Sequence, residues 1–142
     1  MQVWEMTNVS DKFHSLILTE QSEENYSYLR GEFEGHRIEK PWYPPSLKYL
    51  KKRANKSDAP KCWDINAPIF SERAVTALAN FLENTSQLLP LEHEKEKFYA
   101  INVLNIVDGF DKQKSKIKYF NSGKIMNIEE YFFYCDKIEN QH

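Results

Sequence analysis

The clearest pattern of apolar positions along the chain lies between Ser71 and Glu83. Five apolar side chains recur there at the spacing of one helical face: Ala74, Val75, Leu78, Phe81 and Leu82. Serine is a favoured N-cap residue, and Glu72 lies where the helix dipole favours a negative charge. We therefore predict an amphipathic helix over this range, with its apolar stripe forming a principal part of the core.

Apolar, aromatic and β-branched runs elsewhere predict strands. These runs are residues 1–9, 13–19, 88–92, 98–107, 117–120 and 124–135. The run 98–107 is long enough for a central strand, and the turn signals Asp108-Gly109 and Ser122-Gly123 separate the later runs. The chain is therefore predicted to be α+β, with a mostly antiparallel sheet packed by the one principal helix at Ser71 to Glu83.

Composition favours one folded domain over residues 1–142, because 41% of the residues are apolar and 14% are aromatic. The net charge of −2 argues against a nucleic-acid protein that works by broad phosphate neutralisation. The first twenty residues lack a signal-peptide pattern, and no apolar run is long enough to cross a bilayer. Cys62 and Cys135 lack the spacing of redox or zinc motifs. We expect a cytoplasmic protein that binds neither membrane nor nucleic acid.

No catalytic or cofactor motif is recognisable, so we expect no cofactor, no metal and no catalytic residue. The group Glu92-His93-Glu94 could hold a metal weakly, but on a strand its middle side chain points away from the other two. Asp108 and Asp111 could supply carboxylates to a small enzyme's site together with His93. The competing interpretation, which we favour, is that the two aspartates build a turn after a strand.

Two segments carry charge patterns that suit a protein partner. The first 39 residues hold eight acidic and three basic side chains. The acidic and aromatic residues clustered there are candidate partner contacts, with a solvated loop as the alternative; they are Glu20, Glu23, Glu24, Tyr26, Tyr28, Glu32 and Glu34.

The second segment has lysines at every other position, namely Lys112, Lys114, Lys116 and Lys118. On a strand they would form a basic ridge that attracts an anionic partner. The alternative is an edge strand whose lysines prevent aggregation. An uncovered sheet edge could also pair two copies of the chain as a homodimer.

A run of short motifs resembles the immunity proteins of bacterial polymorphic toxin systems, a former domain of unknown function named after a myxobacterial immunity protein. The motifs are Trp63-Asp64-Ile65, Pro68-Ile69-Phe70-Ser71-Glu72-Arg73-Ala74, Leu88-Leu89-Pro90-Leu91, Phe98-Tyr99-Ala100-Ile101-Asn102-Val103, and Asp108 to Asp111 with Ser115. The resemblance spans about Pro41 to Tyr134. Members of that family usually continue with a further strand and helix, whereas this sequence stops at His142; a shortened member, a cassette-type relative and a coincidence of pattern all stay open.

The resemblance implies a non-enzymatic protein that binds and neutralises a cognate toxin in the cytoplasm, and it transfers no catalytic residue. Two other functions stay open from the residues. One is the small enzyme with a carboxylate and histidine site near Asp108 and Asp111. The other is a homo-oligomeric adaptor that pairs through its sheet edge.

Overall fold

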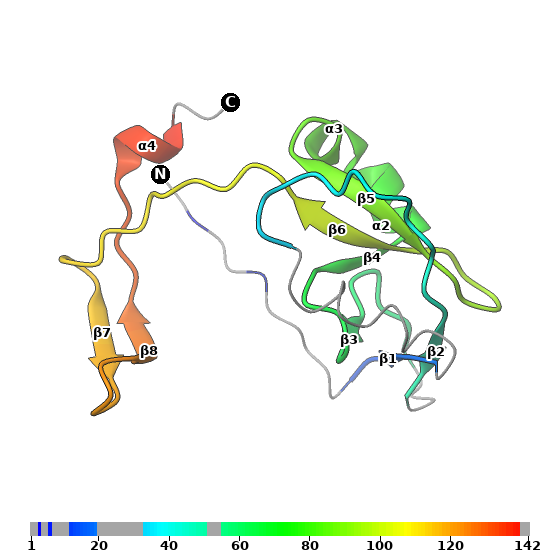
Figure 1. Cartoon of the computed structure of the whole chain (residues 1–142), viewed down its shortest axis with the longest axis horizontal. Helices are drawn as coiled ribbons and strands as arrows, with labels where there is room; N and C mark the ends of the chain where they lie inside the picture. Colours follow the sequence, from blue (N-terminus) through cyan, green and yellow to red (C-terminus); the bar gives the residue numbers. More distant parts are fainter. Residues whose placement is uncertain (1–2, 4–5, 7–11, 20–32, 51–54, 140–142) are drawn as a thin grey trace. The chain divides into compact units, whose positions relative to one another are not determined.

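The computed structural model describes residues 3, 6, 12–19, 33–50 and 55–139 (Figure 1). The chain divides into two compact units. One, here called the core unit, is Met6–Asn105; the other, here called the hairpin unit, comprises Met1–Glu5 and Ile106–His142. Each unit is described by itself, and the single domain expected from composition stays a prediction.

Within the described ranges, strands outnumber helices. The strands are β1 (Ser15–Leu18), β2 (Leu47–Tyr49), β3 (Lys61–Cys62), β4 (Ile69–Ser71), β5 (Ser86–Leu91), β6 (Phe98–Val103), β7 (Lys116–Tyr119) and β8 (Ile125–Glu130). The helices are α2 (Glu72–Ala77), α3 (Ala79–Leu82) and α4 (Cys135–Glu139). The sheets are antiparallel except where β1 pairs with β3, so the predicted α+β class is confirmed.

The core unit contains two three-stranded sheets, ordered β2-β1-β3 and β4-β6-β5. The predicted central strand is confirmed as β6, which pairs with β4 on one side and β5 on the other, although it ends at Val103. The predicted run at 13–19 forms β1, and the run at 88–92 lies largely in β5. The expected strand over residues 1–9 lies almost wholly outside the described residues.

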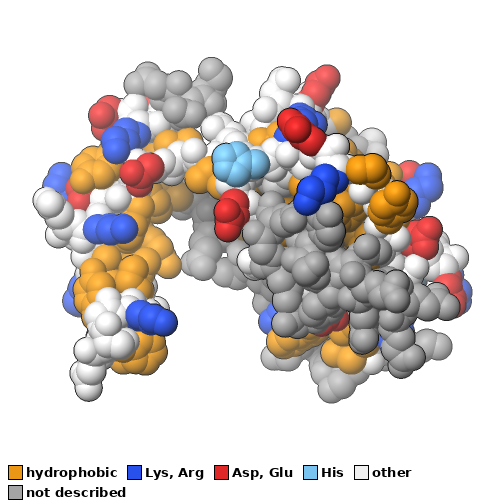
Figure 2. Space-filling model, viewed as in Figure 1, with side chains coloured by type: hydrophobic (Ala, Val, Ile, Leu, Met, Phe, Trp, Pro, Cys, Tyr) orange, Lys and Arg blue, Asp and Glu red, His pale blue; other side chains and the backbone are white. Residues whose placement is uncertain are grey.

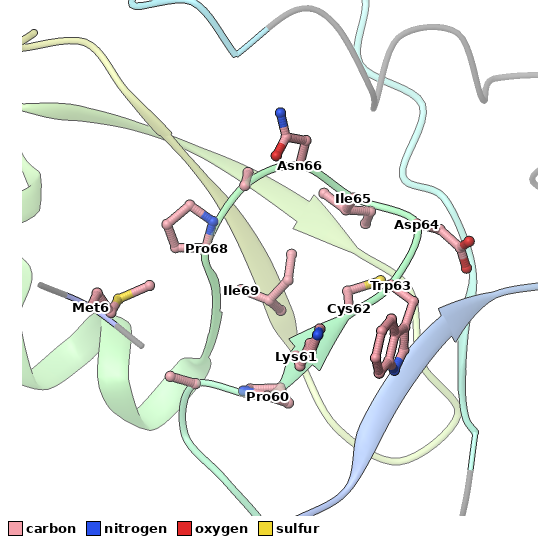
Figure 3. Close-up of a pocket in the computed structure, with 12 residues that line it drawn as sticks. Met6, Pro60, Lys61, Cys62, Trp63, Asp64, Ile65, Asn66, Pro68 and Ile69 are labelled. Atoms are coloured by element: carbon pink, nitrogen blue, oxygen red, sulfur yellow. The ribbon is translucent and has the colours of Figure 1, made fainter. Parts of the chain in front are cut away.

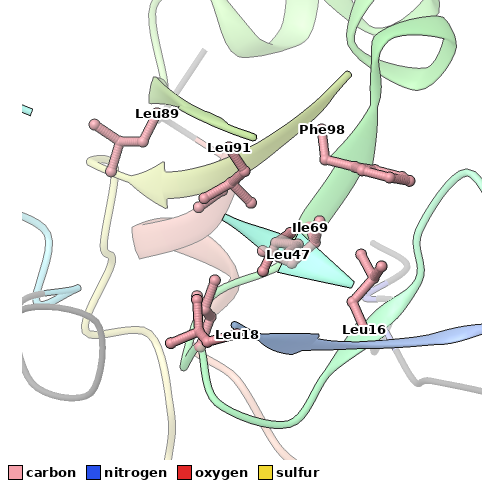
Figure 4. Close-up of a cluster of buried hydrophobic side chains, with 9 residues drawn as sticks. Leu16, Leu18, Leu47, Ile69, Leu89, Leu91 and Phe98 are labelled. Carbon is pink, nitrogen blue, oxygen red and sulfur yellow. The ribbon is translucent and has the colours of Figure 1, made fainter. Parts of the chain in front are cut away.

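Alternating side chains of both sheets make the hydrophobic core of this unit (Figure 4). On the second sheet, Ala100 lies opposite both Ile69 and Leu89, so these three share one face. Leu16 of β1 is completely buried, and it belongs to the same cluster. The core is therefore built between sheets, from residues that alternate along strands, rather than from one helical stripe.

The helix prediction is right at its start and wrong in its continuation. The Ser71 hydroxyl accepts the Ala74 N–H at 3.2 Å, so the predicted N-cap is confirmed. The helix is interrupted at Leu78, whose φ of −103° and ψ of 11° lie outside the helical range, and it resumes as α3. Leu82 is buried, while Phe81 is 79% exposed. The stripe is not a principal part of the core.

The described part of the hairpin unit contains β7, β8 and α4 (Figure 1). The predicted turn at Ser122-Gly123 joins the strands, where the Gly123 N–H donates to the Phe120 carbonyl at 2.9 Å. Gly123 has a φ of +79°, which a residue without a Cβ adopts at little cost. The run at 124–135 is not one strand, because β8 ends at Glu130 and α4 begins at Cys135.

Candidate functional site

Asp111 of the hairpin unit is buried and forms a turn. Its Oδ1 accepts the backbone N–H groups of Gln113 at 3.0 Å and Lys114 at 3.1 Å. Burial alone would raise the pKa of the Asp111 carboxyl, but the amides of Lys114 and Gln113 and the Tyr134 hydroxyl outweigh it and hold the pKa below its usual range. The carboxylate is thus occupied by bonds that define the turn.

Ser115 completes this turn. Its hydroxyl donates to the Asp111 carbonyl at 2.6 Å and accepts the Phe132 N–H at 2.9 Å, so the turn is joined to the segment that follows β8. Asp108 is exposed, and the hairpin unit has no histidine among its described residues. His93 belongs to the core unit. The geometry supports the turn interpretation for Asp111.

The four lysines do not form one ridge. Lys112 and Lys114 lie in the turn before β7, and only Lys116 and Lys118 belong to the strand. Both of these ammonium groups pair with Glu129, at 3.4 Å and 2.5 Å. The prediction of one strand carrying all four lysines is wrong because Asp111 accepts the backbone N–H groups of Gln113, Lys114 and Ser115. These bonds form a turn, so the side chains of residues 112–115 do not alternate as they would on a strand. The charge that an anionic partner would meet is partly neutralised.

The same hairpin has one apolar face. Ile117 lies opposite Ile128, and Tyr119 opposite Ile125. Ile117 and Tyr119 alternate with Lys116 and Lys118 along β7, and each pairs with an isoleucine of β8, although the register shifts beside each of these pairs. Tyr119 is 52% exposed and Ile125 is 45% exposed. Figure 2 shows hydrophobic side chains gathered along the hairpin.

A cavity of about 970 Å³ in the core unit brings several titratable groups together. The Tyr49 ring lies between those of His14 and His93, with centroid distances of 4.5 and 4.7 Å. The Tyr49 hydroxyl donates to Glu96, whose second oxygen accepts Lys56 Nζ at 2.9 Å. Burial, followed by the bond to Glu96, raises the pKa of Tyr49. These groups are engaged with one another.

The possible metal group Glu92-His93-Glu94 borders this cavity without converging on a point. A Glu92 carboxylate oxygen accepts the Ser46 hydroxyl at 2.8 Å, while His93 Nδ1 accepts the Lys95 N–H at 3.3 Å. Among the described residues, no group of three or more potential ligands is placed to hold a metal ion. The sequence suggested a metal site only because Glu92, His93 and Glu94 are consecutive, and Glu92 and His93 instead bond different neighbours.

A second cavity, of about 590 Å³, lies beside β3 (Figure 3). Lys61 Nζ lies 3.5 Å from the centre of the Trp63 ring, a cation–π contact at its edge. Burial raises the pKa of the Cys62 thiol to about 11, so this thiol is a poor nucleophile. Cys62 and Cys135 are both free thiols. The lining offers no candidate catalytic pair.

The predicted acidic contacts lie mostly outside the described residues. Glu34 is the exception, and it is exposed. It belongs to a stretch, here called the anchored segment (residues 33–45), that runs beside β5 and β6 (cyan in Figure 1). Sequence reasoning missed this stretch as a site. Its signal was the proline-rich run Lys40-Pro41-Trp42-Tyr43-Pro44-Pro45, which predicts extended backbone but not what holds it.

Two amide side chains hold the backbone of the anchored segment. The Asn102 Nδ2 donates to the His36 carbonyl at 2.8 Å. The Gln87 side chain bonds both backbone groups of Ile38, accepting its N–H at 2.8 Å and donating to its carbonyl at 3.0 Å. Asn102 is completely buried, and its Oδ1 has no partner among the described residues.

Further bonds hold the second half of this segment. The Trp42 indole donates to the Pro90 carbonyl at 2.8 Å, and the Glu92 N–H donates to the Pro45 carbonyl at 3.0 Å. The Ile38 and Trp42 side chains pack against the hydrophobic core. The segment therefore has a defined backbone conformation fixed from its inner side.

Comparison with known proteins identified no relative: no family model matches the chain, and neither a curated protein nor a solved structure does. None of the described helices combines the length and the apolar composition needed to span a bilayer.

Proposed function

We propose that this chain is a non-enzymatic binding protein of the immunity type, which neutralises a cognate bacterial toxin in the cytoplasm by direct contact. The motif run that resembles such immunity proteins suggests the class of partner. The geometry supports the less specific part of the proposal, which is binding to another protein. The aspartates that could have served an enzyme are engaged in, or adjacent to, a structural turn.

The observation that carries the proposal is the exposed apolar surface of the hairpin unit. Six large apolar side chains there are each between 45% and 52% exposed; they are Tyr119, Phe120, Ile125, Met126, Tyr131 and Phe132. Aromatic residues and methionine are enriched at protein interfaces, and large exposed apolar patches mark interaction sites. Removing these apolar side chains from water would favour binding, while the neighbouring lysines and Glu129 would form the polar rim of the contact.

Co-expression tests the proposal. The reading frames adjacent to this gene are expressed singly in a bacterial host, and any that stops growth is expressed again with this protein. We expect growth to be rescued, and the two purified proteins to migrate together in size-exclusion chromatography. Absence of any toxic neighbour, or a toxic neighbour that is neither rescued nor bound, would contradict the proposal.

A charge variant locates the contact. Tyr119→Glu places a carboxylate on the apolar face of the hairpin and should abolish rescue. Lys112→Glu makes a charge reversal at an exposed position in the turn before β7, outside the strand pair, and is the matched control for folding of the hairpin unit. Equal loss with both variants, accompanied by loss of folded signal in circular dichroism, would assign the effect to unfolding instead of to contact.

A homo-oligomer is a second candidate, favoured by the same apolar face. A two-stranded hairpin is marginally stable alone, so packing of two such faces would stabilise both copies. Light scattering on the purified chain decides between the candidates. A monomer at micromolar concentration would remove the oligomer, whereas a dimer that Tyr119→Glu dissociates would favour it over the immunity function.

A further inference from the structure

We draw no further inference here: the strongest candidate, the cavity of about 970 Å³ between β2 and the segment that joins β5 to β6, carries nothing, because Tyr49, Glu96 and Lys56 already bond one another there and nothing in the structure selects the chemistry of a ligand.

Discussion

Two adjacent residues of α3 provide the sharpest test of the structure. Phe81 and Leu82 both belong to the apolar stripe predicted from the sequence, so a continuous helix would bury both. In the structure the chain departs from helical geometry at Leu78, and Leu82 is 9% exposed whereas Phe81 is 79% exposed. Truncating each to alanine should therefore have unequal effects on stability.

The expected magnitudes follow from these exposures. Leu82→Ala removes buried methyl groups and leaves a cavity, at a cost of about 2–3 kcal/mol in the free energy of unfolding. This lies in the lower part of the usual range because α3 is a single turn whose neighbours can relax. Phe81 withdraws only about a fifth of its side chain from water, worth roughly 0.5 kcal/mol. Alanine is the better helix former by about the same amount, so Phe81→Ala should be nearly neutral.

Urea unfolding followed by tryptophan fluorescence and by circular dichroism measures both values. The dependence of the unfolding free energy on urea should stay equal among wild type and variants, which shows that the same transition is compared. A loss above about 2 kcal/mol for Phe81→Ala, equal to or greater than that for Leu82→Ala, would refute the interrupted helix. That result would restore the continuous amphipathic helix of the sequence prediction.

Three further predictions concern single groups. The hydrogen bond donated by the Tyr49 hydroxyl lowers the pKa of the Glu96 carboxyl below its ordinary 4.5. The ionised carboxylate therefore stabilises the fold above pH 4.5, and this stabilisation is lost as the pH falls through the lowered pKa. Glu96→Gln should be less stable than wild type at pH 7, and the urea midpoints of the two proteins should converge as the pH falls below 4.5. At pH 8, iodoacetamide should modify exposed Cys135 faster than Cys62, whose pKa is raised by burial to about 11, and mass spectrometry would contradict this if the order were reversed. Gly123→Ala should lower the free energy of unfolding by about 1 kcal/mol because φ is +79°, and an unchanged urea midpoint would contradict the turn geometry.

The strands were the part of the fold most accessible from sequence. Residues 98–103 form the central strand because their β-branched and aromatic side chains suit a pleated surface, and that preference acts locally. The N-cap at Ser71 was predictable for a similar reason, since its hydroxyl bonds an amide only three residues away. Patterns whose cause lies within a few residues can be read along the chain.

The candidate sites were less accessible. The lysine spacing at 112–118 suggested one strand, but Asp111 captures the amides of Gln113 and Lys114 and bends the first half into a turn. Side-chain bonds from an aspartate to nearby amides offer the backbone an alternative to a strand, so local sequence alone does not decide between the turn and the strand. The expected acidic contacts from Glu20 to Glu32 lie outside the described residues and stay predictions, and so does the toxin partner.

The sequence by itself determined the α+β class, the start of the helix and most strand positions, because these follow from side-chain alternation and capping within short windows. Only the tertiary structure decided that Phe81 faces outward and that the anchored segment has a defined conformation. Two of the bonds that hold this segment are long-range: Ile38 and Gln87 are separated by 49 positions in the sequence, and His36 and Asn102 by 66. No local pattern reports such pairings, because the paired residues are far apart in the sequence and the packing of the sheets brings them together.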